Sequence, residues 1–313
     1  MTLIFRRFRV VEALAQGGMG EIFLVDDVVN GGRAVLKVRR ADVDHGAARF
    51  EHEVEVLRAL DHPLIPRWLA DGEWQGRRAV AVAYVEGLPL GQVMARIARP
   101  FAPRAVVAVG VDVLRALDHA HRLVTDDGVP RALVHRDVSP HNILVSPTGR
   151  AHLIDFGIAT DVGFGEETAT EVSGTPAYMA PEQASGQAID DRADQFALGV
   201  VLWEMLAGTD LFGGESLESV WRKLGRCVIP ALPTLPDLPG PMSMVVMRML
   251  SVRPQDRFSS CAGAAEALSA SLAPSDTAVA ALLEEASAIA AVAAPVESTR
   301  PCRLSGRGAV IAL

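Results

Sequence analysis

Two carboxylates and one amide in the middle of the chain have the residue types and spacing that phosphate chemistry needs. Asp137, Asn142 and Asp155 flank two short apolar segments, 143–145 and 151–154, which a Pro-Thr-Gly turn separates. This pattern predicts a β-hairpin that brings the three side chains to one end. Carboxylate and amide oxygens suit Mg²⁺, which takes its other ligands from water and substrate phosphates. A carboxylate outside that ligand set could accept a proton from an attacking hydroxyl, and we expect Asp137 to do so.

The loops at the two ends of this hairpin resemble the catalytic and metal-binding loops of eukaryotic-type (Hanks-type) protein kinases. The first loop reads His-Arg-Asp at 135–137, with four residues between Asp137 and Asn142, and the second reads Asp-Phe-Gly at 155–157. Seven specified positions at fixed spacing arise by chance on the order of once in 10⁹ random starts. The resemblance implies that Asp137 is the catalytic base and that Asn142 and Asp155 bind Mg²⁺.

The catalytic loop departs from the family pattern at one position. Ser139, followed by Pro140, replaces the family's usual lysine two residues after the base. That lysine supports the γ-phosphate, and losing one such group costs roughly 3–4 kcal/mol if nothing compensates. Thr175 and Ser139 could share hydrogen bonding around Asp137, although neither replaces a charge. The HRDVSPxN loop resembles that of bacterial kinases, so we interpret it as a subfamily variant.

The N-terminal part of the chain, 8–38, predicts a meander of short strands. Its first hairpin resembles the glycine-rich loop of the kinases, in which glycines let the backbone approach phosphate oxygens. The first glycine of the family pattern is replaced by alanine in this chain. The resemblance implies that this hairpin binds ATP through Ala15, Gly17, Gly18, Gly20 and Ile22.

The strand that ends at Lys37 resembles the strand whose lysine contacts the α- and β-phosphates of ATP. After it, apolar residues at helical spacing predict a helix over 46–60. Glu51, Glu53 and Glu55 all lie on this helix, so composition alone does not choose the partner of the lysine. Alignment with the family selects Glu53, and we expect the other two acids to be solvated.

The segment VAYVEG, which begins at Val82, resembles the hinge between the two lobes of a kinase. It follows a predicted hairpin over 71–82. The resemblance makes Val82 the gatekeeper and has the backbones of Ala83 and Val85 contact adenine. The same ATP site would include Val35, where the family has alanine, and Leu144.

The segment 158–180 is poor in large apolar residues, and the sequence GTPAYMAPE at 174–182 resembles the end of a Ser/Thr-kinase activation segment. Arg136, directly before the base, could clamp a phosphothreonine through bidentate charged hydrogen bonds. We therefore expect phosphorylation at Thr168 or Thr170 to order the segment. The alternative is a threonine-rich loop without a switch.

The apolar stretch 190–208 predicts a long helix that ends at a glycine C-cap. The resemblance makes it the central helix of the large lobe, with Asp194 holding the backbone of the catalytic loop. It also predicts a structural ion pair between Glu182 and Arg257.

Two further helical patterns run over 90–99 and 103–123. His119 and His121 lie near the end of the second pattern, and neither has a cysteine or acid at metal-binding spacing. We interpret both as polar residues of a helix end.

The resemblance covers residues 8–271 and implies an α+β, bilobal fold. A small antiparallel β lobe with one helix would span 8–86, and a larger, mainly α lobe would span 87–271. The remaining residues, 272–313, are rich in alanine and serine. They predict a tail with one amphipathic helix over 277–293.

Composition limits the partners and the location. The net charge of −8 and the absence of a Lys/Arg run argue against a nucleic-acid partner. The N-terminus lacks the apolar run of a signal peptide. Segment 278–296 contains Glu284 and Glu285, so we expect a surface helix there and no membrane span. Three widely spaced cysteines predict reduced thiols and a cytoplasmic protein: Cys227, Cys261 and Cys302.

Three functions from different classes fit these motifs. The first is an active kinase that uses ATP and Mg²⁺ to phosphorylate serine or threonine of proteins, including its own activation segment. The second, suggested by Ala15 and Ser139, is a nucleotide-binding pseudokinase scaffold. The third is a small-molecule phosphotransferase, which the APE segment at 180–182 and Arg257 disfavour because they indicate a protein-substrate surface.

Overall fold

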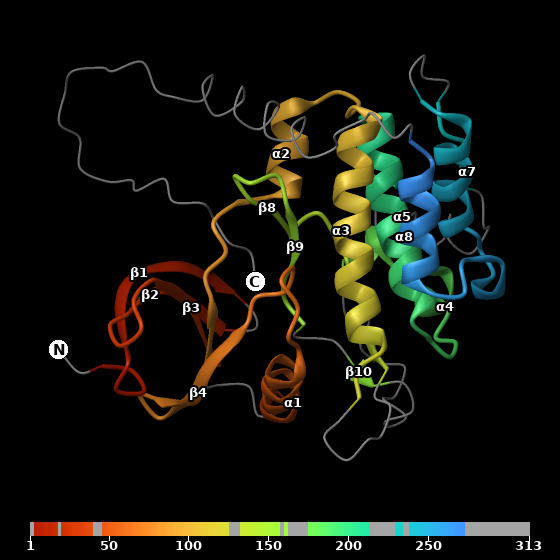
Figure 1. Ribbon diagram of the computed structural model, residues 1–313. Helices are drawn as coiled ribbons and strands as arrows, with labels where there is room; N and C mark the ends of the chain where they lie inside the picture. Colours follow the sequence, from red (N-terminus) through yellow and green to blue (C-terminus); the bar gives the residue numbers. More distant parts are fainter. Residues whose placement is uncertain are drawn as a thin grey trace, which may run out of the picture.

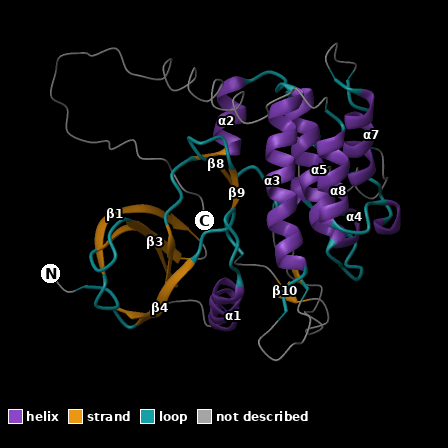
Figure 2. Ribbon diagram, in the orientation of Figure 1, coloured by secondary structure: helices purple, strands orange, loops and turns teal. Residues whose placement is uncertain are grey.

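The computed structural model shows two lobes, one built mainly of strands and one mainly of helices (Figures 1 and 2). In Figure 1 the strands β1–β4 gather on the left, α3, α5, α7 and α8 lie on the right, and β8 and β9 lie between them. The expected α+β bilobal fold is therefore confirmed. The structure describes residues 3–17, 20–39, 46–124, 132–156, 160–161, 175–212, 229–233 and 238–272.

The small lobe is a five-stranded antiparallel sheet with strand order β1-β2-β3-β5-β4. Both of its faces are covered, because alternate residues of β3 and β5 enter two different apolar clusters. Val35 and Val82, paired across these strands, face the cluster nearer the helical lobe. Lys37, two residues after Val35, lies on that same face. The strand bounds are β1 Phe8–Gly17, β2 Gly20–Asp27, β3 Arg33–Arg39, β4 Trp68–Trp74 and β5 Arg77–Ala83.

The predicted hairpin between β4 and β5 is confirmed. Its two-residue turn consists of Gln75 and Gly76, with φ angles of 52° and 72°. Positive φ at both central residues twists the turn to match the twist of the strands.

One helix, α1 (Gly46–Ala59), covers the sheet on the side of the helical lobe. Phe50, Val54 and Leu57 recur at helical spacing and are buried against Val35 and other residues of the sheet. Glu53 shares their face, because it lies three residues after Phe50 and one before Val54. The helix therefore directs this acid toward the sheet.

The helical lobe is built around α5 (Arg192–Ala207), which is buried along nearly its whole length. An apolar surface all round is typical of a helix at the centre of a core. The helix ends at Gly208, whose φ of 69° confirms the predicted C-cap. The other helices of this lobe are α2 Leu90–Ile97, α3 Pro103–His121, α4 Pro181–Ala184, α7 Gly240–Met249 and α8 Cys261–Ala270.

Helix α8 lies close against α3 because α3 has a glycine at the contact. A Cβ atom at Gly110 would collide with the side chain of Leu268. This close packing brings the start of α8, at Cys261, near the end of α3, at His121.

The helical lobe also contains two small sheets of short strands. The strands β6 (Leu88–Pro89), β8 (Ile143–Val145) and β9 (Ala151–Leu153) form one of them. The other pairs β7 (Leu133–Val134) with β10 (Thr160–Asp161).

Two predicted helices end at other residues than expected, and several residues singled out in the sequence lie outside the described part of the chain. The helices expected over 90–99 and 103–123 end two residues early, at Ile97 and His121. Gly18, Thr168, Thr170, Cys227, Cys302 and the helix expected over 277–293 lie outside the described residues. Within the described part, no helix has both the length and the apolar content to cross a membrane.

Candidate active site

The predicted hairpin is present and brings its flanking residues together. Strands β8 and β9 pair in antiparallel fashion, with Ile143 opposite Leu153. Gly149, with a φ of 74°, closes the turn between them. At the other end, the Ile154 amide donates to the Asn142 carbonyl at 2.9 Å. This bond fixes the segment before Asp155 beside the segment that follows Asp137.

The carboxylate of Asp137 is held by hydrogen bonds to both of its oxygens. Oδ1 accepts from the amide and the hydroxyl of Thr175, at 2.8 and 2.9 Å. Oδ2 accepts from Nδ2 of Asn142 at 2.9 Å, and the same nitrogen donates to the Asp137 carbonyl. This orientation of the Asn142 amide directs its oxygen away from Asp137.

The expectation for Ser139 was wrong. Its hydroxyl does not bond Asp137; it is fully buried and has no hydrogen-bond partner among the residues that the structure describes. The Ser139 carbonyl, however, accepts from the Asn142 amide at 3.0 Å. The residue thus shapes the loop through its backbone, and among the described residues it is Thr175 whose hydroxyl bonds Asp137.

Lys37 forms ion pairs with residues of both lobes. Its Nζ lies 2.6 Å from Oε1 of Glu53 and 3.3 Å from Oδ1 of Asp155. Burial opposes the lysine's charge, but the carboxylates of Asp155 and Glu53 outweigh it and raise the pKa of Lys37 well above its usual value. The structure pairs Lys37 with Glu53, while Glu51 lies exposed and pairs with Arg78.

Asp155 and Asn142 provide a donor set that fits Mg²⁺. Asp155 follows the end of β9 with a φ of 61°, an uncommon angle for a residue with a side chain. The rings of Phe156 and His135 pack edge to face, with their centroids 4.6 Å apart. The His135 ring also forms a hydrogen bond of 3.1 Å with the Ile154 carbonyl. The segment is thereby fixed so that a carboxylate and an amide oxygen, both hard ligands, stand at one end of the hairpin.

Most of the residues expected around adenine meet in one apolar cluster between the lobes. Buried Leu144 comes from β8 of the helical lobe, and Ala15 and Val85 pack against the cluster's rim. The Ala83 amide donates to the Arg67 carbonyl at 2.8 Å, so of its two backbone groups only the carbonyl is available to a base. Of the residues expected around adenine, the small lobe contributes Ile22, Val35 and Val82 to the buried part of this cluster.

The glycine-rich hairpin is described at its two strand ends. Gly17 of β1 pairs with Gly20 of β2. The φ of Gly20 is 152°, and a Cβ at this position would collide with the Val38 carbonyl on the neighbouring strand. Glycine is therefore required where the hairpin crosses the end of β3.

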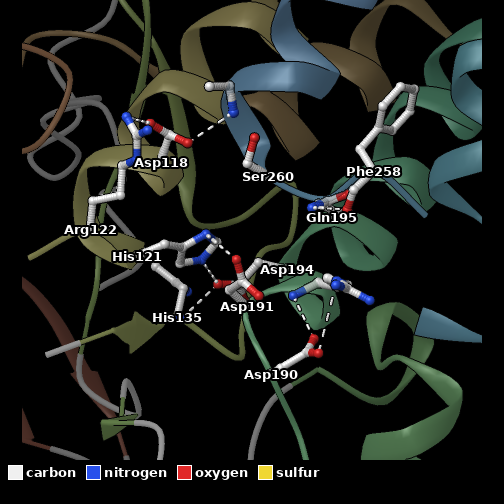
Figure 3. Close-up of polar contacts among 12 residues, drawn as sticks. Asp118, His121, Arg122, His135, Asp190, Asp191, Asp194, Gln195, Phe258 and Ser260 are labelled. Atoms are coloured by element: carbon white, nitrogen blue, oxygen red, sulfur yellow. Dashed lines mark hydrogen bonds and ion pairs between the residues drawn. The ribbon is translucent and has the colours of Figure 1, made fainter. Parts of the chain in front are cut away.

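Two buried carboxylates hold the site's loops, as expected. The Asp194 carboxylate accepts the amide of His135, which Figure 3 shows, and the amide of Arg136, each at 2.8 Å. Glu182 accepts two bonds from the Arg257 guanidinium, at 2.6 and 2.8 Å. The first interaction positions the catalytic loop, and the second ties the segment after Thr175 to the helical lobe.

Three polar contacts around the site were not anticipated from the sequence. His121, interpreted as a polar helix-end residue, is in fact buried and bonds Asp194. Its position could have been inferred, because it continues the buried stripe of Leu114 and Leu117. The second is an ion pair between Asp112 and Arg150, the residue directly before β9. The third is a hydrogen bond from the Tyr178 hydroxyl to Glu204.

Comparison with known proteins agrees with this geometry. A model of the "Protein kinase domain" family matches residues 8–271. The chain is 31% identical over 267 residues to the serine/threonine-protein kinase PknB of Mycobacterium tuberculosis, covering 82% of this chain and 41% of PknB. It is 30% identical to PrkC of Bacillus subtilis, covering 80% of this chain and 38% of PrkC. It is 34% identical to Pkn1 of Myxococcus xanthus, covering 85% and 38%.

The chain thus spans about two fifths of the length of the curated relatives that it matches. All three relatives are bacterial serine/threonine-protein kinases, and the family match extends over both lobes. The chain therefore belongs to the protein kinase family, among its bacterial Hanks-type serine/threonine members.

Proposed function

We propose that this protein transfers the γ-phosphoryl group of ATP to serine or threonine hydroxyls of proteins. The observation that carries the proposal is the convergence of four groups from both lobes. Asp137, Asn142 and Asp155 lie at one end of the hairpin, and Lys37 reaches Asp155 from the small lobe. Phosphoryl transfer asks a protein mainly for positioning and charge neutralisation, and this arrangement supplies both.

The nucleotide would lie between the lobes, against the apolar cluster described above. Val35 and Leu144 would contact the two faces of adenine, and Val82 would limit the depth of the pocket. The Ala83 carbonyl and the Val85 backbone would bond the edge of the base. Lys37 would contact the α- and β-phosphates, with Glu53 holding its side chain in place.

Asn142 and Asp155 would hold Mg²⁺. When bound, the metal neutralises the charge that develops on the transferred phosphate oxygens. Gly17, Gly18 and Gly20 would let backbone amides approach the same phosphates from the small lobe.

Asp137 would orient the attacking hydroxyl and accept its proton. Thr175 and Asn142 fix the carboxylate from both sides. Because Thr175 lies at the end of the activation segment, the position of the base depends on that segment. We propose that phosphorylation at Thr168 or Thr170 favours this arrangement, with Arg136 as the phosphate's partner.

A protein substrate has a suitable surface beside the base. A cavity of about 430 Å³ lies next to the catalytic loop. Pro140 and His141 of that loop line it, together with Met94 of α2 and with Ala177 and Tyr178 after Thr175. Residues flanking the phosphorylated side chain could enter it, which favours a polypeptide over a small molecule.

We also propose a cytoplasmic location, because the sequence predicts reduced thiols.

The pseudokinase alternative rests on the missing lysine at Ser139. The serine side chain is buried and carries no charge, so this position supplies no cation to the γ-phosphate. The base, the metal ligands and the lysine that contacts the α- and β-phosphates are all present, and for this reason we favour an active enzyme.

The test is phosphate incorporation from labelled ATP with Mg²⁺, comparing the parent with Asp137→Asn. We expect labelled serine or threonine in the parent and a loss of roughly 10²–10⁴-fold in the variant. Asp61→Asn, which changes an exposed aspartate of another loop, is the matched control and should retain parent activity. Nucleotide binding without incorporation in the parent would instead support the pseudokinase.

A further inference from the structure

The loop that joins α1 to β4 follows a helix of the small lobe but packs in the core of the helical lobe. Its buried residues Leu64 and Ile65 belong to the same apolar cluster as α3, α5 and α8. The Leu64 carbonyl accepts the Leu153 amide of β9 at 2.9 Å. The loop therefore connects α1, which carries Glu53, with the strand that leads to Asp155.

Two stacked histidine rings hold this loop against α3. His62 of the loop and His119 near the end of α3 have ring centroids 5.2 Å apart and planes inclined by 27°. Nδ1 of His62 accepts from the Leu64 amide at 3.3 Å. Nε2 of His119 accepts from the Asp61 amide at 3.4 Å. A ring nitrogen accepts an amide only through its lone pair, so both imidazoles are neutral in this arrangement.

Protonation of the two rings would disrupt this contact in two ways. An added proton goes to the nitrogen that accepts the amide, so the hydrogen bond to the loop backbone is lost. Protons on both rings would also place two positive charges side by side, and both side chains are only partly exposed. Like charges at this separation repel each other more strongly than they would in bulk water.

The surroundings of His62 favour its neutral form. Burial lowers the pKa of His62 below its usual value of 6.5, and the neighbouring His119 lowers it further. Asp112 of α3 opposes this shift, whereas Arg150 before β9 and Arg115 of α3 add to it. The other titratable side chains of this region are Asp61 of the loop, Asp118 and Arg122 at the end of α3, and His152 of β9.

We propose that His62 and His119, the histidine pair, act as proton-sensitive positioning residues for phosphoryl transfer. While both rings are neutral, the loop stays on α3 and supports Glu53 and Asp155 in their contacts with Lys37. When the rings bind protons, the loop leaves α3, and α1 and the strand before Asp155 lose this support. The kinase is therefore less active in acid. This inference rests on the proposed kinase function.

The direction of the pH effect follows from the lowered pKa. The unfolded chain binds a proton at His62 more readily than the folded protein does. The stabilisation from the neutral ring is therefore complete above about pH 6.5 and is lost as the pH falls toward the lower pKa of the folded state. Activity should decline over the same range.

The experiment compares the parent with the double variant His62→Asn, His119→Gln. Both new side chains have an amide oxygen that can accept a backbone N–H, and neither titrates near neutral pH. His52→Gln, which removes another histidine of α1, is the matched control. Between about pH 7.5 and pH 5.5, the parent and the control should lose at least about threefold more kcat than the double variant. Circular dichroism at both pH values establishes that each protein is folded.

Two structural readouts do not depend on catalysis. In an NMR titration of the ring protons, His119→Gln should raise the pKa of His62 by about half a unit or more, because the neighbouring charge is removed. In hydrogen exchange, the Asp61 and Leu64 amides of the parent should lose at least about fivefold in protection factor over the same pH range. The double variant should keep that protection.

The outcomes are distinct. A parent that transfers no phosphate overturns the proposed function, and the titration and amide exchange then still decide whether the histidine pair holds the loop. An active parent whose pH profile matches that of the double variant overturns the inference, even if the variant is less active at every pH. An unchanged pKa of His62 in His119→Gln also overturns it. If the double variant does not fold, pH-independent protection of the two amides in the parent overturns the inference by itself.

Discussion

At the scale of single residues, Thr175 and Ser139 both carry hydroxyl groups that the sequence suggests for Asp137, and the structure gives them different surroundings. Thr175 donates to Asp137 from its amide and its hydroxyl, whereas the Ser139 hydroxyl is buried and has no partner within the part of the chain that the structure describes. A hydrogen bond to a charged group contributes about 1.5–3 kcal/mol, while an unpaired buried hydroxyl contributes nothing favourable. The two residues should therefore respond very differently to the loss of their hydroxyl groups.

Thr175→Ala should lower kcat roughly 10–100-fold, in line with the loss of one bond to the carboxylate. Thr175→Ser, which keeps the hydroxyl, should recover most of the activity. Ser139→Ala is the matched control and should leave kcat within about twofold and stability unchanged or slightly higher. Steady-state kinetics on folded protein measures all three variants. A larger loss in Ser139→Ala than in Thr175→Ala would contradict the roles assigned to these residues.

At the scale of elements, a buried ion pair holds the segment after Thr175 on the helical lobe. Arg257 and Glu182 are both nearly inaccessible to solvent, and the guanidinium also donates to carbonyls that include Ser251 and Arg192. Because this pair joins α4 to the loop before α8, it fixes the end of the activation segment. Its loss should affect stability first and activity through the displaced segment.

Glu182→Ala leaves the guanidinium buried without its carboxylate, which should cost about 3–5 kcal/mol of unfolding free energy. Asp26→Ala removes an exposed ion pair with Arg9 and should cost less than about 1 kcal/mol. Urea unfolding of both variants gives the comparison. The double variant Glu182→Ala, Arg257→Met should be less destabilised than the sum of the single changes. Simple additivity would show that the two charges do not stabilise each other.

The end of α5 carries a carboxyl whose ionisation should be visible in the pH dependence of stability. Burial raises the pKa of Glu204 to about 7, although the Leu211 amide and Tyr178 hydroxyl bond it. Between its usual value of 4.5 and about 7, the folded protein binds more protons at this site than the unfolded chain. Stability therefore falls as pH rises through this window, and the contribution levels off above it.

Glu204→Gln keeps the shape of the side chain and cannot ionise. Relative to this variant, the parent should lose up to about 3 kcal/mol of unfolding free energy between pH 4.5 and pH 7.5. Denaturant titrations of both proteins across that range measure the difference, and other titrating groups cancel in it. A difference that is constant with pH would mean that Glu204 ionises as an ordinary solvated acid.

The sequence predicts the local elements of this fold, but it does not predict the contacts between elements that are far apart in the chain. Local patterns predicted the β8–β9 hairpin, the hairpin over 71–82 and the cap at Gly208, because each depends on neighbouring residues. Family resemblance predicted Glu53 over Glu51. The bond between His121 and Asp194 joins residues 73 positions apart, and it depends on how α3 and α5 pack. The environment of Ser139 likewise depends on the packed core, and no local pattern encodes either contact.

At the scale of the whole molecule, the proposed nucleotide site belongs to neither lobe alone. Val35 and Lys37 come from the sheet, whereas Leu144 and Asp155 come from the hairpin of the helical lobe. Away from this site the lobes are joined by the Leu153 amide, which bonds the Leu64 carbonyl at 2.9 Å. A ligand that contacts both lobes loses its binding energy if either one unfolds, so its binding should make their unfolding more cooperative.

A non-hydrolysable ATP analogue with Mg²⁺, at about 100 times its Kd, should add about 2.7 kcal/mol of stability. For a domain of this size the added stability corresponds to a rise of roughly 5–10 °C in the melting temperature. Calorimetry should show the whole transition moving upward, since both lobes bind the ligand. Lys37→Met should retain the folded baseline and lose most of the ligand-induced shift, because the phosphates no longer meet a cation. If only part of the transition moved in the parent, the nucleotide would be bound by one lobe, and the two-lobe site proposed here would be wrong.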